Sequence, residues 1–238
     1  MYLIDTHCHL DVAEFDADRA QVIAAARAAG VGEVVVPGIF RDEWDAVEAL
    51  CATDSGLHPA LGLHPVYLDR HHERDVAELG RRVERRRPVA VGEIGLDHFV
   101  EGLDRARQLA LLEGQLQVAR DGGICHAFNG SRQQAEQYLA RDFKLGFGGM
   151  VTYERSSKLR ALARDLPLEA IVLETDAPDM TVASHRFERN SPEYLPEVVA
   201  AIAGVRGVDA EVVARATTAN ARAVLGLPAR AALPGTPA

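Results

Sequence analysis

The amino-acid sequence predicts an α/β fold, a parallel barrel of the TIM (β/α)8 type from which one strand–helix unit is missing. Short apolar segments alternate with amphipathic stretches along the whole chain, which is the pattern of a parallel sheet wrapped by helices. Polar residues able to bind a metal recur where these apolar segments end. The chain has 238 residues, whereas a closed barrel typically needs about 250.

Seven apolar segments are predicted to be strands, because each is short and bounded by turn residues. They cover residues 2–7, 33–39, 58–63, 88–94, 122–127, 143–147 and 170–174. A closed barrel of this type requires eight strands, so one strand is absent from the count.

Six helices with recognisable ends are predicted between and after the strands. The helix over 16–29 stops before Gly30, a residue type that commonly follows a helix in the left-handed conformation. The others are predicted at 42–51, 103–119, 131–140, 193–203 and 209–225. Because the helix over 103–119 runs through Arg120 and Asp121 straight into the next strand, the missing unit belongs between the strands that carry Glu93 and His126.

The sequence indicates a single domain over residues 1–227, followed by a disordered tail at 228–238 that is rich in Ala and Pro. Hydrophobic residues make up 47% of the chain and charged residues 26%, which suits a soluble protein with a large core. No signal-peptide pattern is present, and no apolar run approaches the roughly 20 residues that cross a bilayer. We therefore expect a cytoplasmic protein that makes no membrane contact.

Cysteine content and charge exclude several other classes of protein. Cys8, Cys51 and Cys125 are odd in number and lack CxxC spacing, so they are predicted to be buried free thiols. A net charge of -9 argues against binding nucleic acid through charge alone, and a phosphate substrate would need a metal to attract it. The arginine-rich run 81–87 is predicted to be a solvated helix face.

The first predicted strand ends in a possible metal-binding pair. Strand alternation places Asp5, His7 and His9 on one face and Cys8 on the other. Two imidazoles at the carboxyl end of a first barrel strand are well placed to bind a divalent ion. Taken alone, the pair is only moderately specific, since one histidine could cap the following loop while the other packs in the core.

Four further polar residues end later apolar runs: His64, Glu93, His126 and Asp176. A carboxylate in such a run costs free energy to bury unless it is paired or bound to a metal. Two carboxylates beside several histidines therefore favour a shared cation over separate local roles.

These motifs together resemble those of the TatD family of metal-dependent hydrolases, within the amidohydrolase-like group of barrels. The resemblance covers nearly the whole chain. It rests on DTHCHLD (5–11), GLHP (62–65), GEIGLD (92–97), HAFNGS (126–131), ETDAP (174–178) and NSPEYLP (190–196).

The resemblance implies a site for two metal ions. It implies that His7, His9, Glu93 and Asp176 hold one ion, and that Glu93 bridges to a second ion held also by His126 and by a further histidine. In the family, that further histidine ends a strand between those that carry Glu93 and His126, and this sequence has no such strand. Strand counting and family comparison thus locate the same gap, which leaves the second metal site one ligand short.

Two explanations of the gap remain open at this point: a true loss of the unit, or residues that the printed sequence omits. A true loss leaves backbone donors and acceptors unpaired on the flanking strands, and each buried unpaired group costs about 1–3 kcal/mol. A whole strand of such groups would exceed an ordinary stability of about 5–15 kcal/mol. We therefore expect either that the molecule contains the further residues or that the barrel is distorted or partly open beside His126.

The resemblance and the ligand set imply hydrolysis of phosphodiester bonds from the 3′ end of single-stranded DNA or RNA, without an obligate protein partner. Two divalent ions, Mg, Mn or Zn, are the expected cofactors. Asp176 and Glu93 are the predicted catalytic residues: Asp176 accepts a proton from the attacking water, and Glu93 fixes the separation of the ions. His64 and Asn129 are predicted to contact the substrate phosphate, although His64 could instead order its own loop.

Two alternative functions stay open on the sequence. The first is hydrolysis of a small ester, amide or lactone, because related barrels use similar ligands for those reactions. The second is a degenerate, catalytically weak barrel with one metal site. The second metal ion discriminates between a degenerate barrel and the bridged two-metal hydrolase.

Overall fold

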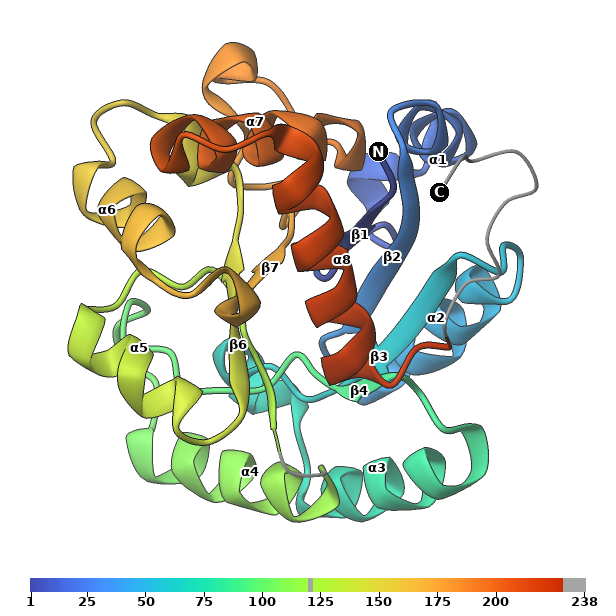
Figure 1. Cartoon of the computed structure of the whole chain (residues 1–238). Coiled ribbons are helices and arrows are strands. Elements are labelled where there is room, and N and C mark those ends of the chain that lie inside the picture. Colours follow the sequence, from blue (N-terminus) through green and yellow to red (C-terminus); the bar gives the residue numbers. More distant parts are fainter. Residues whose placement is uncertain (120–121, 229–238) are drawn as a thin grey trace.

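The computed structural model describes residues 1–119 and 122–228 of the chain, drawn as a ribbon in Figure 1. Its strands confirm the predicted strands in number and order, although most are shorter than their predicted segments. They are β1 (Leu3–Asp5), β2 (Val31–Gly38), β3 (Leu57–Leu61), β4 (Ala90–Val91), β5 (Gly123–Cys125), β6 (Phe143–Phe147) and β7 (Ile171–Leu173).

The helices alternate with the strands and include every predicted helix, with ends that differ by a few residues. They are α1 (Arg19–Ala28), α2 (Trp44–Cys51), α3 (Glu73–Arg86), α4 (Arg105–Val118), α5 (Arg132–Leu139), α6 (Ser157–Asp165), α7 (Leu195–Arg206) and α8 (Ala210–Leu225). Helix α6 was not among the predicted helices, although Leu159 and Leu162 stand at helical spacing and are buried. The arginine-rich run lies at the end of α3, where Arg82 pairs with Asp45 and Glu48 of α2.

Two of the predictions concern residues that the structure does not describe. Residues 120–121, where the sequence locates the missing unit, lie outside the described part of the chain. So do residues 229–238 of the predicted tail.

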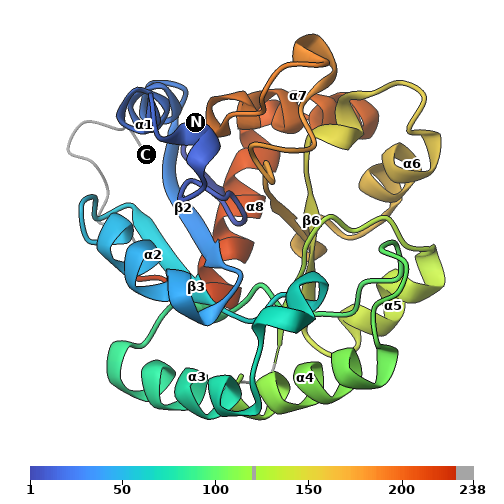
Figure 2. The same ribbon diagram turned by 180° about the vertical axis from the view of Figure 1, so that it is seen from behind.

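The strands form two parallel sheets, ordered β1-β2-β3-β4 and β5-β6-β7. In β2, seven of the eight residues are buried, as expected for a parallel strand covered on both faces. One face of the strands packs against the surrounding helices through Leu3, Val34 and Leu145. The alternate face, which includes Ile4 and Val35, packs against α8. Figure 2 shows the same arrangement from behind.

Backbone hydrogen bonds join the two sheets on the side where β7 meets β1. The Thr6 N–H donates to the Leu173 carbonyl over 2.9 Å, and the Asp176 N–H donates to the His7 carbonyl over 2.8 Å. On the other side, no strand pairing joins β4 to β5 within the described residues. The result is a curled parallel sheet in which a closed barrel is not resolved, and the opening lies beside His126.

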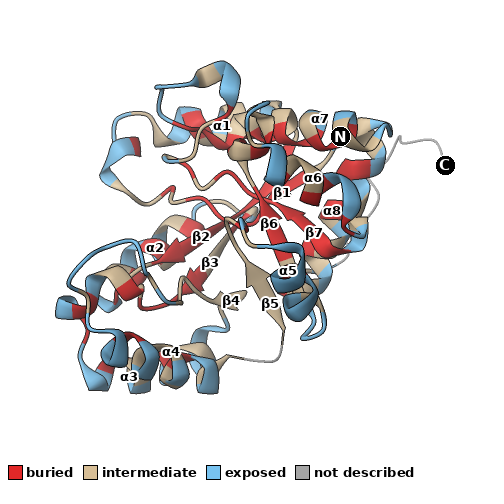
Figure 3. Cartoon of the chain, turned by 90° about the vertical axis from the view of Figure 1, so that its left-hand side faces the viewer, coloured by how far each residue is buried: buried red, intermediate tan, exposed pale blue. Residues whose placement is uncertain are grey.

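The residues of β4 and β5 are half-buried instead of buried, as the tan colour of both strands in Figure 3 shows. The cost calculated above for unpaired buried groups therefore does not apply in full, because water can reach these backbone atoms. A cavity of about 620 Å³ lies between β4 and β5. It is lined by Val91, Ile124 and Leu225, and it extends to Glu93 and His126.

All three cysteines are free thiols, as predicted. Cys8 and Cys51 are buried as expected, whereas Cys125 is only half-buried because it lies on β5 beside the opening. Within the described ranges, no helix combines the length and the apolar character that a bilayer crossing requires.

Candidate metal centre

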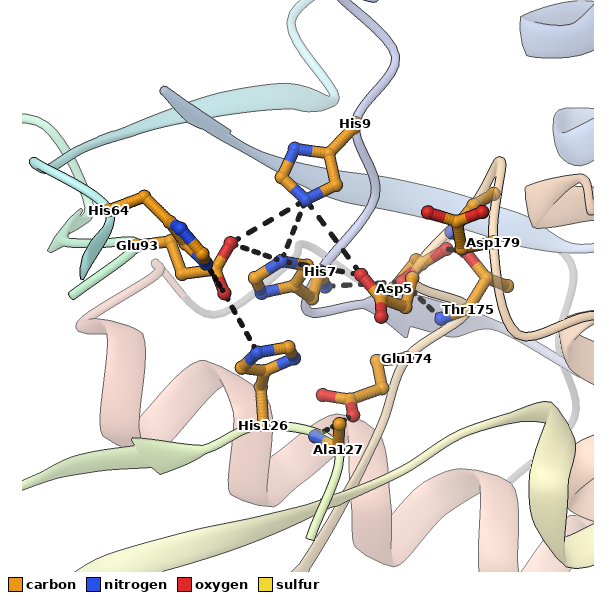
Figure 4. A network of polar contacts seen from close by, with 12 residues as sticks. Asp5, His7, His9, His64, Glu93, His126, Ala127, Glu174, Thr175 and Asp179 are labelled. Atoms are coloured by element: carbon orange, nitrogen blue, oxygen red, sulfur yellow. Dashed lines mark hydrogen bonds and ion pairs between the residues drawn. The ribbon is translucent and has the colours of Figure 1, made fainter. Parts of the chain in front are cut away.

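The carboxyl ends of four strands bring the predicted metal ligands together. His7 and His9 follow β1, Glu93 follows β4, His126 follows β5 and Asp176 follows β7. Figure 4 shows the side chains of His7, His9, Glu93 and His126 pointing toward a common centre. Parallel strands end at the same edge of the sheet, which explains how residues so distant in sequence meet.

The first group of donor atoms has the spacing of a metal site. The His7 Nε2 atom lies 3.2 Å from His9 Nε2 and 3.4 Å from Glu93 Oε2. Asp176 Oδ1 lies 3.6 Å from His7 Nε2 and 3.8 Å from His9 Nε2. Four ligands at about 2.1 Å from a tetrahedral ion stand about 3.4 Å apart, so this group fits a divalent cation.

The second oxygen of Glu93 faces a second pair of histidines. Glu93 Oε1 lies 3.0 Å from His126 Nε2 and 3.1 Å from His64 Nε2. His126 also stacks on His7, with ring centres 4.0 Å apart. Glu93 thus lies between the two groups, one oxygen toward each, which is the arrangement of a bridging carboxylate.

The hydrogen bonds of His64 fix which of its nitrogens carries the proton. Its Nδ1 accepts a hydrogen bond from the Val66 backbone N–H over 3.2 Å, so the neutral ring carries its proton on Nε2. In that tautomer Nε2 is a donor and cannot ligate a metal. His64 is therefore suited to donate to an oxygen, and it does not replace the absent histidine ligand.

Burial and mutual interaction shift the pKa values of these groups in different directions. Burial lowers the pKa of both His7 and His9, so the two rings stay neutral and keep lone pairs for a metal. Burial opposes ionisation of Glu93, but His7, His126 and His64 outweigh it and hold the Glu93 pKa well below its usual range.

The pKa values of the other two ligands, Asp176 and His126, are raised instead of lowered. Burial raises the pKa of Asp176, with a smaller contribution from Glu93. For His126, the hydrogen bond to Glu93 and the nearby carboxylates outweigh burial and raise the pKa to about 9. Without a metal, His126 thus carries the positive charge that faces the carboxylates.

Asp5 has a positioning role that the sequence did not reveal. Its Oδ1 accepts hydrogen bonds from the backbone N–H groups of His7 and Thr175, over 3.2 and 3.0 Å. Its Oδ2 accepts from the Thr175 hydroxyl over 2.5 Å. Asp5 thereby fixes the segment of His7 against the segment of Asp176, across 170 residues of sequence.

Glu174 is a second residue whose place the sequence did not reveal. It is buried, and one carboxylate oxygen accepts from the backbone N–H of Ala127, next to His126. Its other oxygen has no hydrogen-bond partner in the described structure. Burial raises the Glu174 pKa to about 7. In the sequence, only its position in the ETDAP motif indicates that Glu174 belongs to the site.

Asn129 lies apart from these ligands. Its side chain is exposed, and its backbone carbonyl accepts a hydrogen bond from Lys158 Nζ over 2.6 Å. The structure therefore brings together six of the predicted site residues and places the seventh at a neighbouring cavity: His7, His9, His64, Glu93, His126 and Asp176, with Asn129 apart.

Comparison with known families agrees with the resemblance. A sequence model of the family described as TatD related DNase matches residues 4–123 and 120–226. The match is thus split in two at the position where the sequence places the missing unit.

Individual relatives share most of their length with this chain. The uncharacterized metal-dependent hydrolase YjjV of Escherichia coli K12 is 35% identical over 254 residues, covering 94% of this chain and 98% of YjjV. The 3′-5′ ssDNA/RNA exonuclease TatD of Erwinia billingiae is 29% identical, covering 95% of this chain and 100% of that protein. Both alignments are longer than this chain, so the relatives contain residues that have no counterpart here.

The fold is likewise shared. The crystal structure of YjjV, a TatD homologue from Escherichia coli, superimposes with a TM-score of 0.90 over 95% of this chain and 98% of that one, at 35% identity.

Proposed function

The chain belongs to the TatD family of metal-dependent hydrolases, and from this premise we propose that it hydrolyses phosphodiester bonds as a 3′-5′ exonuclease of single-stranded DNA or RNA. The observation that carries the proposal is the convergence of His7, His9, Glu93 and Asp176 donor atoms at metal-ligand spacing. The Erwinia billingiae relative, a 3′-5′ ssDNA/RNA exonuclease, supports the choice of substrate.

The residues divide the reaction between them. A divalent cation held by His7, His9, Glu93 and Asp176 would lower the pKa of water and stabilise the charge that develops on the phosphate. Asp176 accepts the proton of the attacking water, a role that suits a carboxylate whose pKa is raised by burial. His64 donates its Nε2 proton to a phosphate oxygen, as its tautomer allows. Glu93 holds the two halves of the site together.

One observation favours a second candidate function, a weakly active barrel with one metal ion. A second cluster of donor atoms, from His7, His126 and Asp176, could hold an ion, but it shares His7 and Asp176 with the first group. Beyond the atoms of the first group, the described residues offer only Glu93 Oε1 and His126 Nε2 to a second ion, while His64 presents a proton. Two protein ligands hold an ion more weakly than four do. Counting the ions that remain bound to the purified protein separates this candidate from the two-ion enzyme.

The test of the proposed function uses a single-stranded oligonucleotide labelled at its 5′ end. We expect stepwise shortening from the 3′ end in the presence of Mg²⁺ or Mn²⁺, and none with Glu93→Gln. Glu33→Gln, which removes a carboxylate far from the site, is the matched control and should retain activity. Hydrolysis of a nitrophenyl ester without oligonucleotide shortening would contradict the proposal and favour a small-molecule substrate.

A further inference from the structure

A second cavity, of about 230 Å³, lies beside the metal centre. Its floor is the end of β6, and its sides are the β5–α5 loop and the first turn of α6. Ala127, which lines it, directly follows His126, and Met180 lies four residues beyond Asp176. Two of the segments that hold the metal ligands therefore also form this cavity.

The lining of the cavity combines two kinds of chemistry. Phe128, Met150 and Met180 provide apolar surface, and thioether side chains adapt readily to flat aromatic groups. Arg155 and Lys158 provide positive charge, and both side chains are exposed.

These two cations have no carboxylate partner in the described part of the chain. The Arg155 guanidinium lies 5.4 Å from the centre of the Tyr153 ring, and Lys158 Nζ contacts the Asn129 carbonyl. None of the described residues that line the cavity is acidic. In a chain of net charge -9, a cavity with two unpaired cations is suited to an anion.

We propose that this cavity is a nucleotide subsite, in which the apolar wall holds a base while Arg155 and Lys158 bind the adjoining phosphate. The inference rests on the proposed function, because a strand whose scissile phosphate lies at the metal centre must continue past it. A base on an apolar surface and a phosphate on cations are the two contacts that single strands commonly use. Asn129 also lines this cavity and is exposed, so its amide is available to a bound base.

The test measures binding of two small probes to the metal-loaded protein by calorimetry. Adenosine 5′-monophosphate contains no phosphodiester bond, so the proposed activity does not consume it. Adenosine lacks the phosphate and reports on the apolar wall alone. The variants are Arg155→Gln with Lys158→Gln, which removes the cations, and Ser157→Tyr, which fills the mouth. The matched control is Arg132→Gln with Arg141→Gln, two exposed arginines on and just after α5 that do not line the cavity.

We expect the cation variant to bind adenosine 5′-monophosphate about tenfold more weakly and adenosine unchanged, because charge-assisted contacts to phosphate are lost. Ser157→Tyr should weaken both probes, and the control pair neither. Equal binding of adenosine 5′-monophosphate by all variants would overturn the proposal, since the metal centre alone would then hold the phosphate. Absence of any binding by the unmodified protein would also overturn it.

The outcome is distinguishable from that of the proposed function. If the oligonucleotide is not shortened but the probes respond to the variants as expected, the subsite stands and the exonuclease activity fails. If the oligonucleotide is shortened while the probes ignore the variants, the exonuclease activity stands and the subsite fails.

Discussion

Two glutamates, the buried Glu33 and the half-buried Glu93, lie at opposite ends of the sheet, each beside histidines, yet their surroundings differ. Glu33, near the start of β2, receives hydrogen bonds from the Tyr2 hydroxyl over 2.7 Å and pairs with His58 over 2.8 Å, and it also pairs with Arg222. Glu93, beyond the end of β4, faces histidines, and no lysine or arginine pairs with it in the described structure.

The difference distinguishes a structural carboxylate, Glu33, from one that we propose as a metal ligand, Glu93. The Arg222 guanidinium pairs with Glu33, so the Glu33 cluster contains its own cation. At Glu93 the pKa values of His7 and His9 are lowered by burial, so two carboxylates face the protonated His126 alone. Histidines beside a carboxylate therefore favour a metal site when no arginine or lysine pairs with that carboxylate, as at Glu93.

The largest expected effect belongs to Asp176. Asp176→Asn should lower kcat by about 1000-fold or more, because it removes both a ligand and a proton acceptor. The assay is the rate of shortening of the 5′-labelled oligonucleotide at saturating metal. A decrease of less than tenfold would contradict the role given to Asp176. The contrast between a catalytic metal centre at Glu93 and a structural cluster at Glu33 would then lack its catalytic part.

Breaking the ion pair at the other end should affect folding instead of catalysis. Arg222→Met should lower the free energy of unfolding by about 3 kcal/mol, since it leaves Glu33 buried without its fixed cation. Arg132→Met, in an exposed pair with Glu136, is the control and should change it by at most about 0.5 kcal/mol. Equal urea midpoints for both variants would show that the Glu33 cluster is not self-neutralised through Arg222.

Metal removal should affect stability in a way that depends on the Glu93 end alone. At a metal concentration of about 100 times Kd, binding stabilises the folded state by about 2.7 kcal/mol, which corresponds to about 5–10 °C in Tm. A chelator should therefore lower the Tm of the unmodified protein and of Glu33→Gln alike. In Glu93→Gln the chelator should have little effect, and thermal unfolding with and without chelator measures all three cases.

The smallest effect is a dependence of stability on pH at the Glu33 end. Burial opposes ionisation of Glu33, but Tyr2, His58 and Arg222 outweigh it and hold the Glu33 pKa below its ordinary value of 4.5. A carboxylate with a lowered pKa in the folded state stabilises it above the ordinary pKa, and this contribution is lost as the pH falls through the folded pKa.

The measurement is urea unfolding of the unmodified protein and Glu33→Gln at several pH values. The stability difference between them should be constant above about pH 5 and shrink below pH 4.5. A difference that grows on acidification would mean that the sign of the shift is wrong.

The sequence predicted the strands and the meeting of the metal ligands for one physical reason. Parallel strands are buried on both faces and read as apolar runs, and whatever follows each run lies at the same edge of the sheet. This reasoning also located the gap, because a missing strand changes the count.

The parts that could not be predicted depend on contacts between distant segments. The hydrogen bonds between Asp5 and Thr175 and between Glu174 and Ala127 join residues that no local sequence pattern connects. How the fold accommodates the missing strand also depends on distant segments. β4 and β5 stay half-buried beside a cavity that the end of α8 helps to line. The motif predicts that Asn129 contacts the substrate phosphate, and its loop places it at the cavity beside the metal centre.

The most direct test of the comparison is the metal content of three proteins after saturation with Mn²⁺ or Zn²⁺ and gel filtration, determined by elemental mass spectrometry. We expect the unmodified protein and Glu33→Gln to retain the same number of ions per chain, and Glu93→Gln to retain none. Equal metal content in Glu93→Gln, or loss of metal in Glu33→Gln, would contradict the assignment of the metal centre to the Glu93 end of the sheet.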